Sequence, residues 1–174
     1  MSFNDEVDQV YLRQEKTVKR TGQAAGVGGD WSPAADFGIF TIAGGPVRIT
    51  GLFGHVTAVF AGANAIPLIT YGAANALCVV AVAAAFALNS LLVWDGSLTA
   101  VSGVLRATAA LAHNQSSDSI GTAATAESWT GTILCLAGQI NIVNAGGAAD
   151  ATGVVDWYLS YIPLTSAANV VAIP

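Results

Sequence analysis

The chain has 174 residues, of which 53% are hydrophobic and 10% are charged, and its formal net charge is −5. This length is typical of one domain with a short appendage. The acidic balance argues against nucleic acid as a partner, because no stripe of Lys and Arg is present to replace the counterions of phosphates. The first residues are polar and lack the apolar core of a secretory signal, so we expect none.

The charged residues are unevenly distributed along the chain. Eight of the seventeen lie within residues 1–20, and only Arg48 and Arg106 are basic beyond that segment. Soluble domains usually carry about a quarter charged residues, so Thr, Ser, Asn, Ala and Gly must cover much of this surface. A monomer with so few surface charges tends to associate with itself. We therefore infer that partner subunits cover a good part of the surface.

The first twenty residues have a weak helical pattern. Val7, Val10 and Tyr11 recur at helical spacing and form a thin apolar stripe. So narrow a stripe stabilises a helix only when it docks against another surface. We therefore expect residues 1–20 to form at most a short helix that depends on docking.

The composition of residues 21–36 predicts an extended arm. Residues 21–36 are rich in Gly and Ala and contain Pro33, which is typical of a flexible or extended chain. Trp31 is its one anchor, because a tryptophan in a glycine-rich leader needs a pocket to bury it, and a neighbouring subunit is one source of that pocket. We divide the chain into an N-terminal arm, residues 1–36, and a β-sandwich domain, residues 37–174.

The clearest strand signal lies in residues 37–60, FGIFTIAGGPVRITGLFGHVTAVF. Residues alternate on both sides of Gly44-Gly45-Pro46, and this pattern predicts a β-hairpin because glycine supplies the positive φ that tight hairpin turns require. Both faces of the second strand are largely apolar, which favours a strand covered on both sides. One of those faces is predicted to carry Val47, Ile49, Gly51, Phe53 and His55.

The rest of the chain is predicted to contain short strands separated by turns. We expect strands at 65–71, 77–83, 91–94 and 98–105, a polar loop at 113–128, one long strand or two at 129–143 interrupted at Gly138, and a loop at 144–152. Strands at such regular spacing indicate a sandwich or a barrel. We therefore predict an all-β fold, an antiparallel β-sandwich or a jelly-roll-like barrel with an extended N-terminal arm.

The last predicted strand, residues 153–164, has the cleanest alternation. Its two sets of side chains must point to opposite sides of a sheet, because the side-chain period of a strand is two. One face carries Val155, Trp157, Leu159 and Tyr161, and the other carries Val154, Asp156, Tyr158, Ser160 and Ile162.

A membrane segment is the main alternative for the middle of the chain. The run Ala76–Leu88 is continuously apolar, but it is shorter than the roughly 20 residues that cross a bilayer. No Lys or Arg stands near either end to orient such a segment. A buried strand followed by a turn, or a short buried helix, fits the run better, and we expect no membrane partner.

The sequence carries no catalytic signature. His55 and His113 are the only histidines, and no Cys, Asp or Glu stands at zinc-ligand spacing around them. We expect His55 to be a hydrogen-bonded residue on a strand or at an interface. The glycine groups lack the Lys and Ser or Thr of a phosphate loop, and no G-x-S-x-G elbow is present. We therefore expect no enzyme and no cofactor.

The acidic residues and the cysteines do not indicate a functional site either. Four acids lie in or beside two polar loops and would hold calcium only if the loops converged, namely Asp118, Glu127, Asp150 and Asp156. Because they lack the spacing of a calcium loop, we interpret them as scattered solvated acids and expect no metal site. Cys78 and Cys135 lie in apolar runs and are expected to be buried thiols, with a cross-strand disulfide as the alternative.

Four segments carry a resemblance to a known class of proteins, namely IFTIAGGPVRITGLFGHVTAVF, ALCVVAVAAAF, SLLVWDG and VVDWYLSYIPL. Together, over about residues 37–164, they resemble small virion proteins of tailed bacteriophages that are encoded among the head genes and described as head decoration or minor structural proteins. The resemblance rests on pattern and segment order. It implies a β-sandwich subunit, expected to be a homotrimer, bound to the major capsid protein on the outer surface of the shell. The implied location is the virion, and the host cytoplasm during assembly.

Three functions follow from this reading. The first is a structural virion protein that cements capsomers, in which apolar contacts build the oligomer and residues 1–36 latch it to the shell. The second is a tail or fibre binding module that recognises a host glycan or protein through the loops at 113–128 and 144–152, although neither loop contains an aromatic residue. The third is a small integral membrane protein, which the hydropathy supports least.

The first function defines two sets of candidate residues. The residues of the arm expected to contact the capsid are Tyr11, Arg13, Lys16, Lys19, Arg20 and Trp31. The residues expected at the interface between subunits are Phe53, His55, Trp157 and Tyr161. Aromatic and Arg side chains are the usual anchors of protein interfaces.

Overall fold

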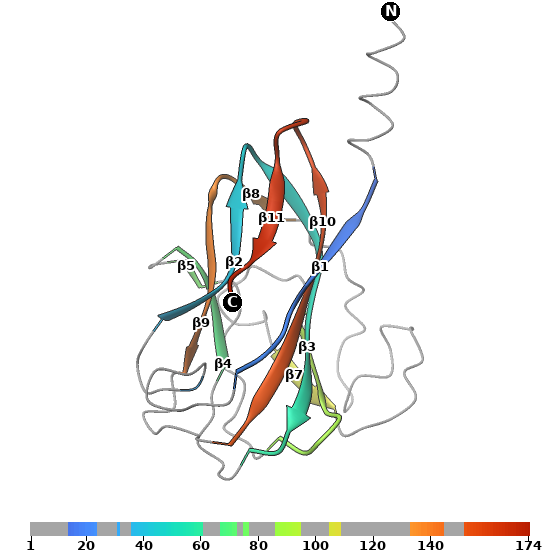
Figure 1. Cartoon of the computed structure of the whole chain (residues 1–174), viewed down its shortest axis with the longest axis vertical. Coiled ribbons are helices and arrows are strands. Elements are labelled where there is room, and N and C mark those ends of the chain that lie inside the picture. The colour runs from blue at the N-terminus through green and yellow to red at the C-terminus, as the bar shows by residue number, and fades with distance from the viewer. Residues whose placement is uncertain are drawn as a thin grey trace, which may run out of the picture.

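The computed structural model of this chain describes residues 14–23, 31, 36–60, 67–72, 75–76, 86–94, 105–108, 133–144 and 152–174. In this part, the chain forms strands and no helix (Figure 1). The strands are β1 (Lys16–Arg20), β2 (Asp36–Ala43), β3 (Val47–Ala58), β4 (Pro67–Tyr71), β5 (Asn75–Ala76), β6 (Leu91–Trp94), β7 (Leu105–Thr108), β8 (Ile133–Cys135), β9 (Gly138–Asn144), β10 (Val154–Pro163) and β11 (Asn169–Ala172).

The strands make two antiparallel sheets. Sheet A has the order β1-β10-β3-β6-β7, with β8 also paired to β3, and sheet B has the order β11-β2-β9-β4-β5. Every strand pair is antiparallel. The predicted all-β antiparallel sandwich is therefore confirmed.

Several predicted strands are present with nearly the predicted bounds. β4 and β6 match the strands expected at 65–71 and 91–94, and β10 matches the strand expected at 153–164. The segment 129–143 contains two strands, and β9 begins at Gly138. The predicted strand at 77–83 and the loop at 113–128 lie outside the described residues. No helix in the described part of the chain has the length and apolar character needed to cross a membrane.

The predicted hairpin at 37–60 is wrong in its pairing. β2 and β3 flank the glycine turn as expected, but β2 belongs to sheet B and β3 to sheet A. The turn therefore carries the chain from one sheet across to the other. Alternating apolar residues report only that each strand has a buried face, and two strands that face each other across a core show the same alternation as two strands that pair.

Two such crossing turns pack together at one end of the sandwich (Figure 1). Leu164, between β10 and β11, donates its backbone N–H to the Pro46 carbonyl over 3.1 Å. Gly44 has φ 74°, and a Cβ there would lie 1.8 Å from the carbonyl oxygen of Ala167. Glycine is thus required at this position both by the left-handed backbone and by the close approach of the second turn.

A bulge in β3 changes which of its residues share a face, because Phe53 and His55 were predicted to lie on the same face as Val47 and Ile49. Ser160 pairs with Gly51 and Tyr161 pairs with Ile49, so Thr50 is an extra residue in β3. Such a residue shifts the alternation by one position. The inward residues of β3 are therefore Val47, Ile49, Leu52, Gly54 and Val56, whereas Arg48, Phe53, His55 and Thr57 lie on the outer face. The expectation that β3 is covered on both sides is also wrong, because Phe53 and Thr57 are exposed.

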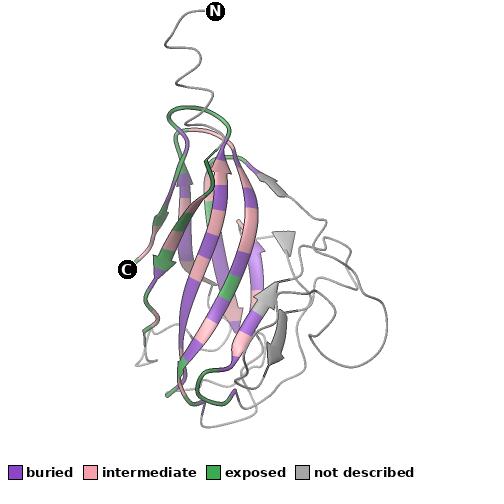
Figure 2. Ribbon diagram, turned by 90° about the vertical axis from the view of Figure 1, so that its right-hand side faces the viewer, coloured by how far each residue is buried: buried purple, intermediate pink, exposed green. Residues whose placement is uncertain are grey.

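The core lies between the inner faces of the two sheets. Figure 2 shows buried residues alternating with more exposed ones along the long strands. Val155, Trp157, Leu159 and Tyr161 share one face of β10, as predicted, and the structure shows that this face points inward, because all four are buried. Trp157 fits beside Gly54, where a Cβ would lie 3.0 Å from the indole ring. Burial of such aromatic rings contributes a large part of the apolar area of a core.

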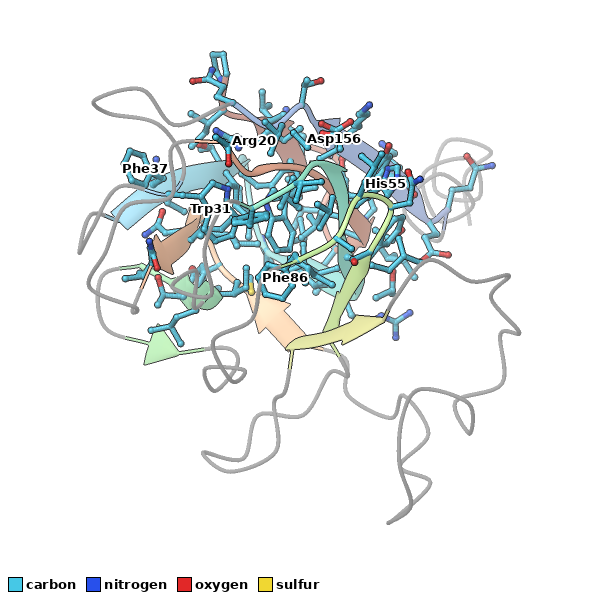
Figure 3. The ribbon with its side chains drawn as sticks, turned by 90° about the horizontal axis from the view of Figure 1, so that it is seen from below. Arg20, Trp31, Phe37, His55, Phe86 and Asp156 are labelled. Atoms are coloured by element: carbon cyan, nitrogen blue, oxygen red, sulfur yellow. The ribbon has the colours of Figure 1, made fainter. Side chains whose placement is uncertain are left out.

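Trp31 fills a pocket inside its own chain. Its side chain is fully buried, and its ring meets Phe60 edge to face at 4.9 Å between centroids. Phe60 in turn meets Phe86 edge to face at 5.2 Å. Asn144 donates its side-chain N–H to the Trp31 carbonyl over 3.1 Å. The expected burial of Trp31 is confirmed, and its pocket lies within its own chain (Figure 3), whereas its role as a capsid contact stays a prediction.

Lys16–Arg20 form β1 and not part of a helix. β1 pairs with β10 over five residues, from Lys16 opposite Tyr161 to Arg20 opposite Trp157. Arg20 is buried and donates Nε–H to the Ile173 carbonyl over 2.9 Å, which ties the edge of sheet A to the chain beyond β11. The helix considered for residues 1–20 is thus wrong over this stretch, because a helix with so thin an apolar stripe gains little from packing, whereas the edge of β10 offers backbone partners along the whole of β1. Residues 1–13 lie outside the described part.

The buried aromatic group gives the first prediction. Trp31→Ala should lower the free energy of unfolding by about 3–5 kcal/mol, the usual range for truncating a large buried ring. Chemical denaturation followed by circular dichroism measures this loss. Trp31→Phe is the matched control and should lose clearly less, because it keeps an aromatic ring beside Phe60. Unchanged stability in Trp31→Ala would contradict the intramolecular pocket.

Candidate interaction surface on the outer face of sheet A

The outer face of sheet A brings together the outward side chains of its three neighbouring strands β1, β10 and β3. The registers place Lys19 opposite Tyr158 and Tyr158 opposite Phe53, so these three residues form one row across the sheet. The next row places Asp156 opposite His55. We call these five residues the sheet A surface. The row arrangement follows from the side-chain period of two together with the Thr50 bulge, which turns Phe53 and His55 outward.

An aromatic stack lies at the centre of this surface. The rings of Phe53 and Tyr158 are parallel within 7°, with 4.7 Å between their centroids. The Lys19 ammonium lies 5.5 Å from the centroid of the Tyr158 ring, within the range of a cation–π contact. Phe53 retains 38% of its accessible surface. An apolar ring so exposed at the middle of a sheet is a preferred type of anchor for protein contacts.

Asp156 ties β1 to this surface. Its carboxylate lies 2.7 Å from Lys19 Nζ and accepts a hydrogen bond of 2.9 Å from the backbone N–H of Gly22. Gly22 lies close against β10, since a Cβ there would be 2.2 Å from the carbonyl oxygen of Val155. These contacts hold both β1 and the residues just after it against β10.

The pKa of Asp156 reflects two opposing effects. Burial by itself raises the pKa of the Asp156 carboxyl, and the hydrogen bonds from Lys19 and Gly22, with the attraction of Lys19 and His55, more than offset that rise. The net result is a lowered pKa, so the carboxylate is ionised in the folded protein at neutral pH. The pKa of Lys19 is raised in turn, first by its hydrogen bond to Asp156 and then by that to Tyr158.

His55 is a hydrogen-bonded residue on a strand, as predicted. Its Nε2 lies 3.2 Å from Oδ1 of Asn89. Asn89 belongs to a turn that is anchored on β3, because its backbone N–H donates to the Val56 carbonyl over 2.9 Å. His55 therefore joins the strand to the neighbouring turn, and Figure 3 shows it beside Asp156.

The structure separates the predicted contact residues into three groups. Tyr11 and Arg13 lie outside the described residues, so their predicted role is untested. Lys16 and Lys19 lie on β1, and Lys19 belongs to the sheet A surface. Phe53 and His55 also belong to this surface, and their predicted role at a subunit interface stays a prediction. The residues Arg20, Trp31, Trp157 and Tyr161 are buried within their own chain and contribute to its fold, and their predicted contact roles stay predictions.

Sequence reasoning missed the partners that complete the surface. Tyr158 and Asp156 were correctly placed on one face of β10, but their contacts with Phe53 and Lys19 depend on the strand register. Register is set by bulges and turns that alternation does not reveal. Asp156 was considered as a calcium ligand, and it instead pairs with Lys19.

The described residues include no cluster of metal ligands and one free cysteine. Within the described ranges, no group of three or more His, Cys, Asp or Glu side chains lies close enough to hold a metal ion. Cys135 is a free, buried thiol, and burial raises its pKa to about 11. It is therefore protonated at neutral pH and poorly nucleophilic. Cys78, Asp118, Glu127 and Asp150 lie outside the described residues.

The sequence matches no protein-family model, and neither a curated protein nor a solved structure is found to match it.

The ion pair at Asp156 gives a pH-dependent prediction. Because the pKa of Asp156 is lowered on folding, its contribution to stability is complete above the ordinary value of 3.8 and is lost as the pH falls through the lowered pKa. Asp156→Asn should therefore be less stable than the wild type at neutral pH, by about 1–2 kcal/mol for the lost charged hydrogen bonds. The difference in the free energy of unfolding between Asp156→Asn and the wild type should disappear in acid. Denaturation curves across pH measure it.

Glu15→Gln serves as the control for this experiment. Glu15 is exposed and accepts a hydrogen bond from the Thr50 hydroxyl, so its change should cost little at any pH. A stability gap for Asp156→Asn that stays constant into acid would show that the carboxylate is not held by these contacts.

Proposed function

We propose that this chain is a structural virion protein, a decoration subunit that assembles with copies of itself and binds the outer surface of a tailed-phage head. The observation that carries the proposal is the Phe53–Tyr158 stack, an exposed aromatic pair at the centre of a sheet in a chain with few charges. Covering such a surface with a partner lowers the free energy, because apolar area is removed from water.

The partner for the sheet A surface is a second copy of this chain. Its charges are of both signs, with Lys19 beside Asp156, so identical copies do not present one uniform charge to each other. The surface is also preorganised, because Phe53, Tyr158 and Lys19 already contact one another within one chain. Little further ordering is needed on association, which favours affinity.

The sandwich also narrows the segment that can act as a latch on the shell. Lys16–Arg20 belong to sheet A and Trp31 belongs to the core, so these residues are needed for the fold. A latch is therefore proposed for residues 1–13 alone, which hold Tyr11 and Arg13. Deletions that probe it should stop at residue 13 and leave β1 intact.

The proposal predicts the effect of a charge at Phe53. Phe53→Asp should weaken self-association by roughly 30-fold, since a buried aromatic anchor is commonly worth about 2 kcal/mol. It should leave the circular dichroism spectrum unchanged, because the side chain is outside the core. Sedimentation measures the oligomer, and co-sedimentation with phage heads assembled without this chain measures binding to the shell.

Val171→Asp is the matched control. Val171 is an exposed apolar residue on β11 of sheet B, and its substitution should affect neither association nor binding to heads under the proposal. A wild-type protein that stays monomeric at high concentration and does not sediment with heads would refute the proposed function. Equal weakening by both variants would refute the role of the sheet A surface.

A further inference from the structure

A second exposed region lies at one end of the sandwich, where three turns cross between the sheets. They are residues 43–46, which run from the last residue of β2 to β3, residues 136–137 between β8 and β9, and residues 164–168 between β10 and β11. All three lie at the same end, because Cys135 and Pro163 both pair with Val47, the first residue of β3. We call these eleven residues the apolar tip, and Figure 2 shows the turns at this end as largely exposed.

The tip carries two exposed leucines and no charge. Leu136 is 69% exposed and Leu164 is 41% exposed. The eleven residues contain no Asp, Glu, Lys, Arg or His. β8 and β10 flank β3 on its two sides, so the two leucines follow strand ends that are about 10 Å apart, twice the spacing of neighbouring strands. The leucines thus stand on either side of Pro46.

Hydrogen bonds fix the shape of the tip. The Leu164 N–H donates to the Pro46 carbonyl over 3.1 Å, and the Thr165 hydroxyl donates to the Gly44 carbonyl over 3.4 Å. On the other side, the Tyr71 hydroxyl donates to the Leu136 carbonyl over 2.9 Å. Both leucines are therefore presented from ordered backbone, and a partner that covers them meets a small cost in conformational entropy.

We propose that the apolar tip is a plug that enters an uncharged apolar socket on the shell protein. This inference rests on the proposed function and assigns to it a specific contact. The chemistry of the tip fits such a socket, because burying its residues requires no charge to lose its water. β1 begins at the same end of the sandwich, since Lys16 pairs with Tyr161, and the proposed latch in residues 1–13 precedes β1 in the sequence.

Two other occupants fit the tip less well. A lipid surface usually attracts proteins through several Lys and Arg near an apolar wedge and through interfacial Trp or Tyr. The eleven residues contain none of these, and Lys16 at the same end adjoins the acidic Glu15. A second tip would add only eleven more residues, whereas a stable interface takes roughly 20–30 residues from each partner. The tip is thus suited to be one anchor within a larger contact.

The test compares two double variants of the full chain. Leu136→Asp with Leu164→Asp places charges on the tip, and Val59→Asp with Leu88→Asp places them on equally exposed apolar residues at the other end of the sandwich. Circular dichroism and thermal unfolding establish that both variants fold. Co-sedimentation with phage heads assembled without this chain gives the affinity, and sedimentation of the protein alone gives the oligomeric mass.

The tip variant should keep the wild-type oligomeric mass and lose roughly tenfold or more in affinity for heads. The control variant should bind heads like the wild type. Equal affinity of the tip variant and the wild type would overturn the proposal. A tip variant that loses its oligomeric mass would assign the tip to a second copy of this chain and would also overturn it.

Two further measurements separate this inference from the proposed function. Flotation with phosphatidylcholine vesicles, with and without phosphatidylserine, tests a lipid occupant, and wild-type binding that the tip variant lacks would overturn the socket.

Retention on a butyl matrix tests the tip without heads. If wild-type protein does not bind heads, the proposed function fails. In that case, lower retention of the tip variant alone keeps the tip as an apolar anchor for another protein, and equal retention of both variants refutes it.

Discussion

β3 and β10 run antiparallel over ten paired residues, and every other described strand of sheet A is attached to one of them, β7 by way of β6. Their inward side chains form one wall of the core, and their outward side chains form most of the sheet A surface. A register shift of one residue would exchange these two sets. The bulges in this pair therefore decide at once which residues stabilise the fold and which are available to a partner. Gly54 adds to this control by leaving room for the Trp157 ring on the inner side.

The class of fold and many of its strands could be predicted from alternation and turn residues. The sheet to which each strand belongs could not be predicted. Gly44 correctly indicated a turn with positive φ, but a turn within one sheet and a turn between two sheets place the same residue types in the same order. Thr50 gave no warning that it was an extra residue, because the residues around it are apolar on both faces. Trp31 correctly indicated a buried anchor, since its size and its glycine-rich surroundings demand a pocket. β1 was missed because its charged residues are unusual in a strand.

The candidate surface was predictable in part. Phe53 and His55 were identified by residue type, since an aromatic and a histidine stand out in a chain with few polar groups. Their neighbours Tyr158 and Asp156 come from a strand about a hundred residues away, and only the register joins them. The two exposed regions are also chemically distinct. The sheet A surface combines stacked rings with paired charges, whereas the apolar tip carries no charge, so the proposed self-association and the proposed shell contact use separate regions of the molecule.

The pairing of β1 with β10 also affects the order in which the strands of sheet A can assemble during folding. Thr17 meets Ser160 across 143 positions of the sequence, and Arg20 reaches the Ile173 carbonyl across 153. Contacts between such distant positions form slowly, because closing a long loop costs entropy before any contact repays it. On the ribosome, β1 can pair with β10 only after residues 154–163 have emerged. This edge of sheet A is therefore completed late in folding, long after the residues of β1 themselves are made.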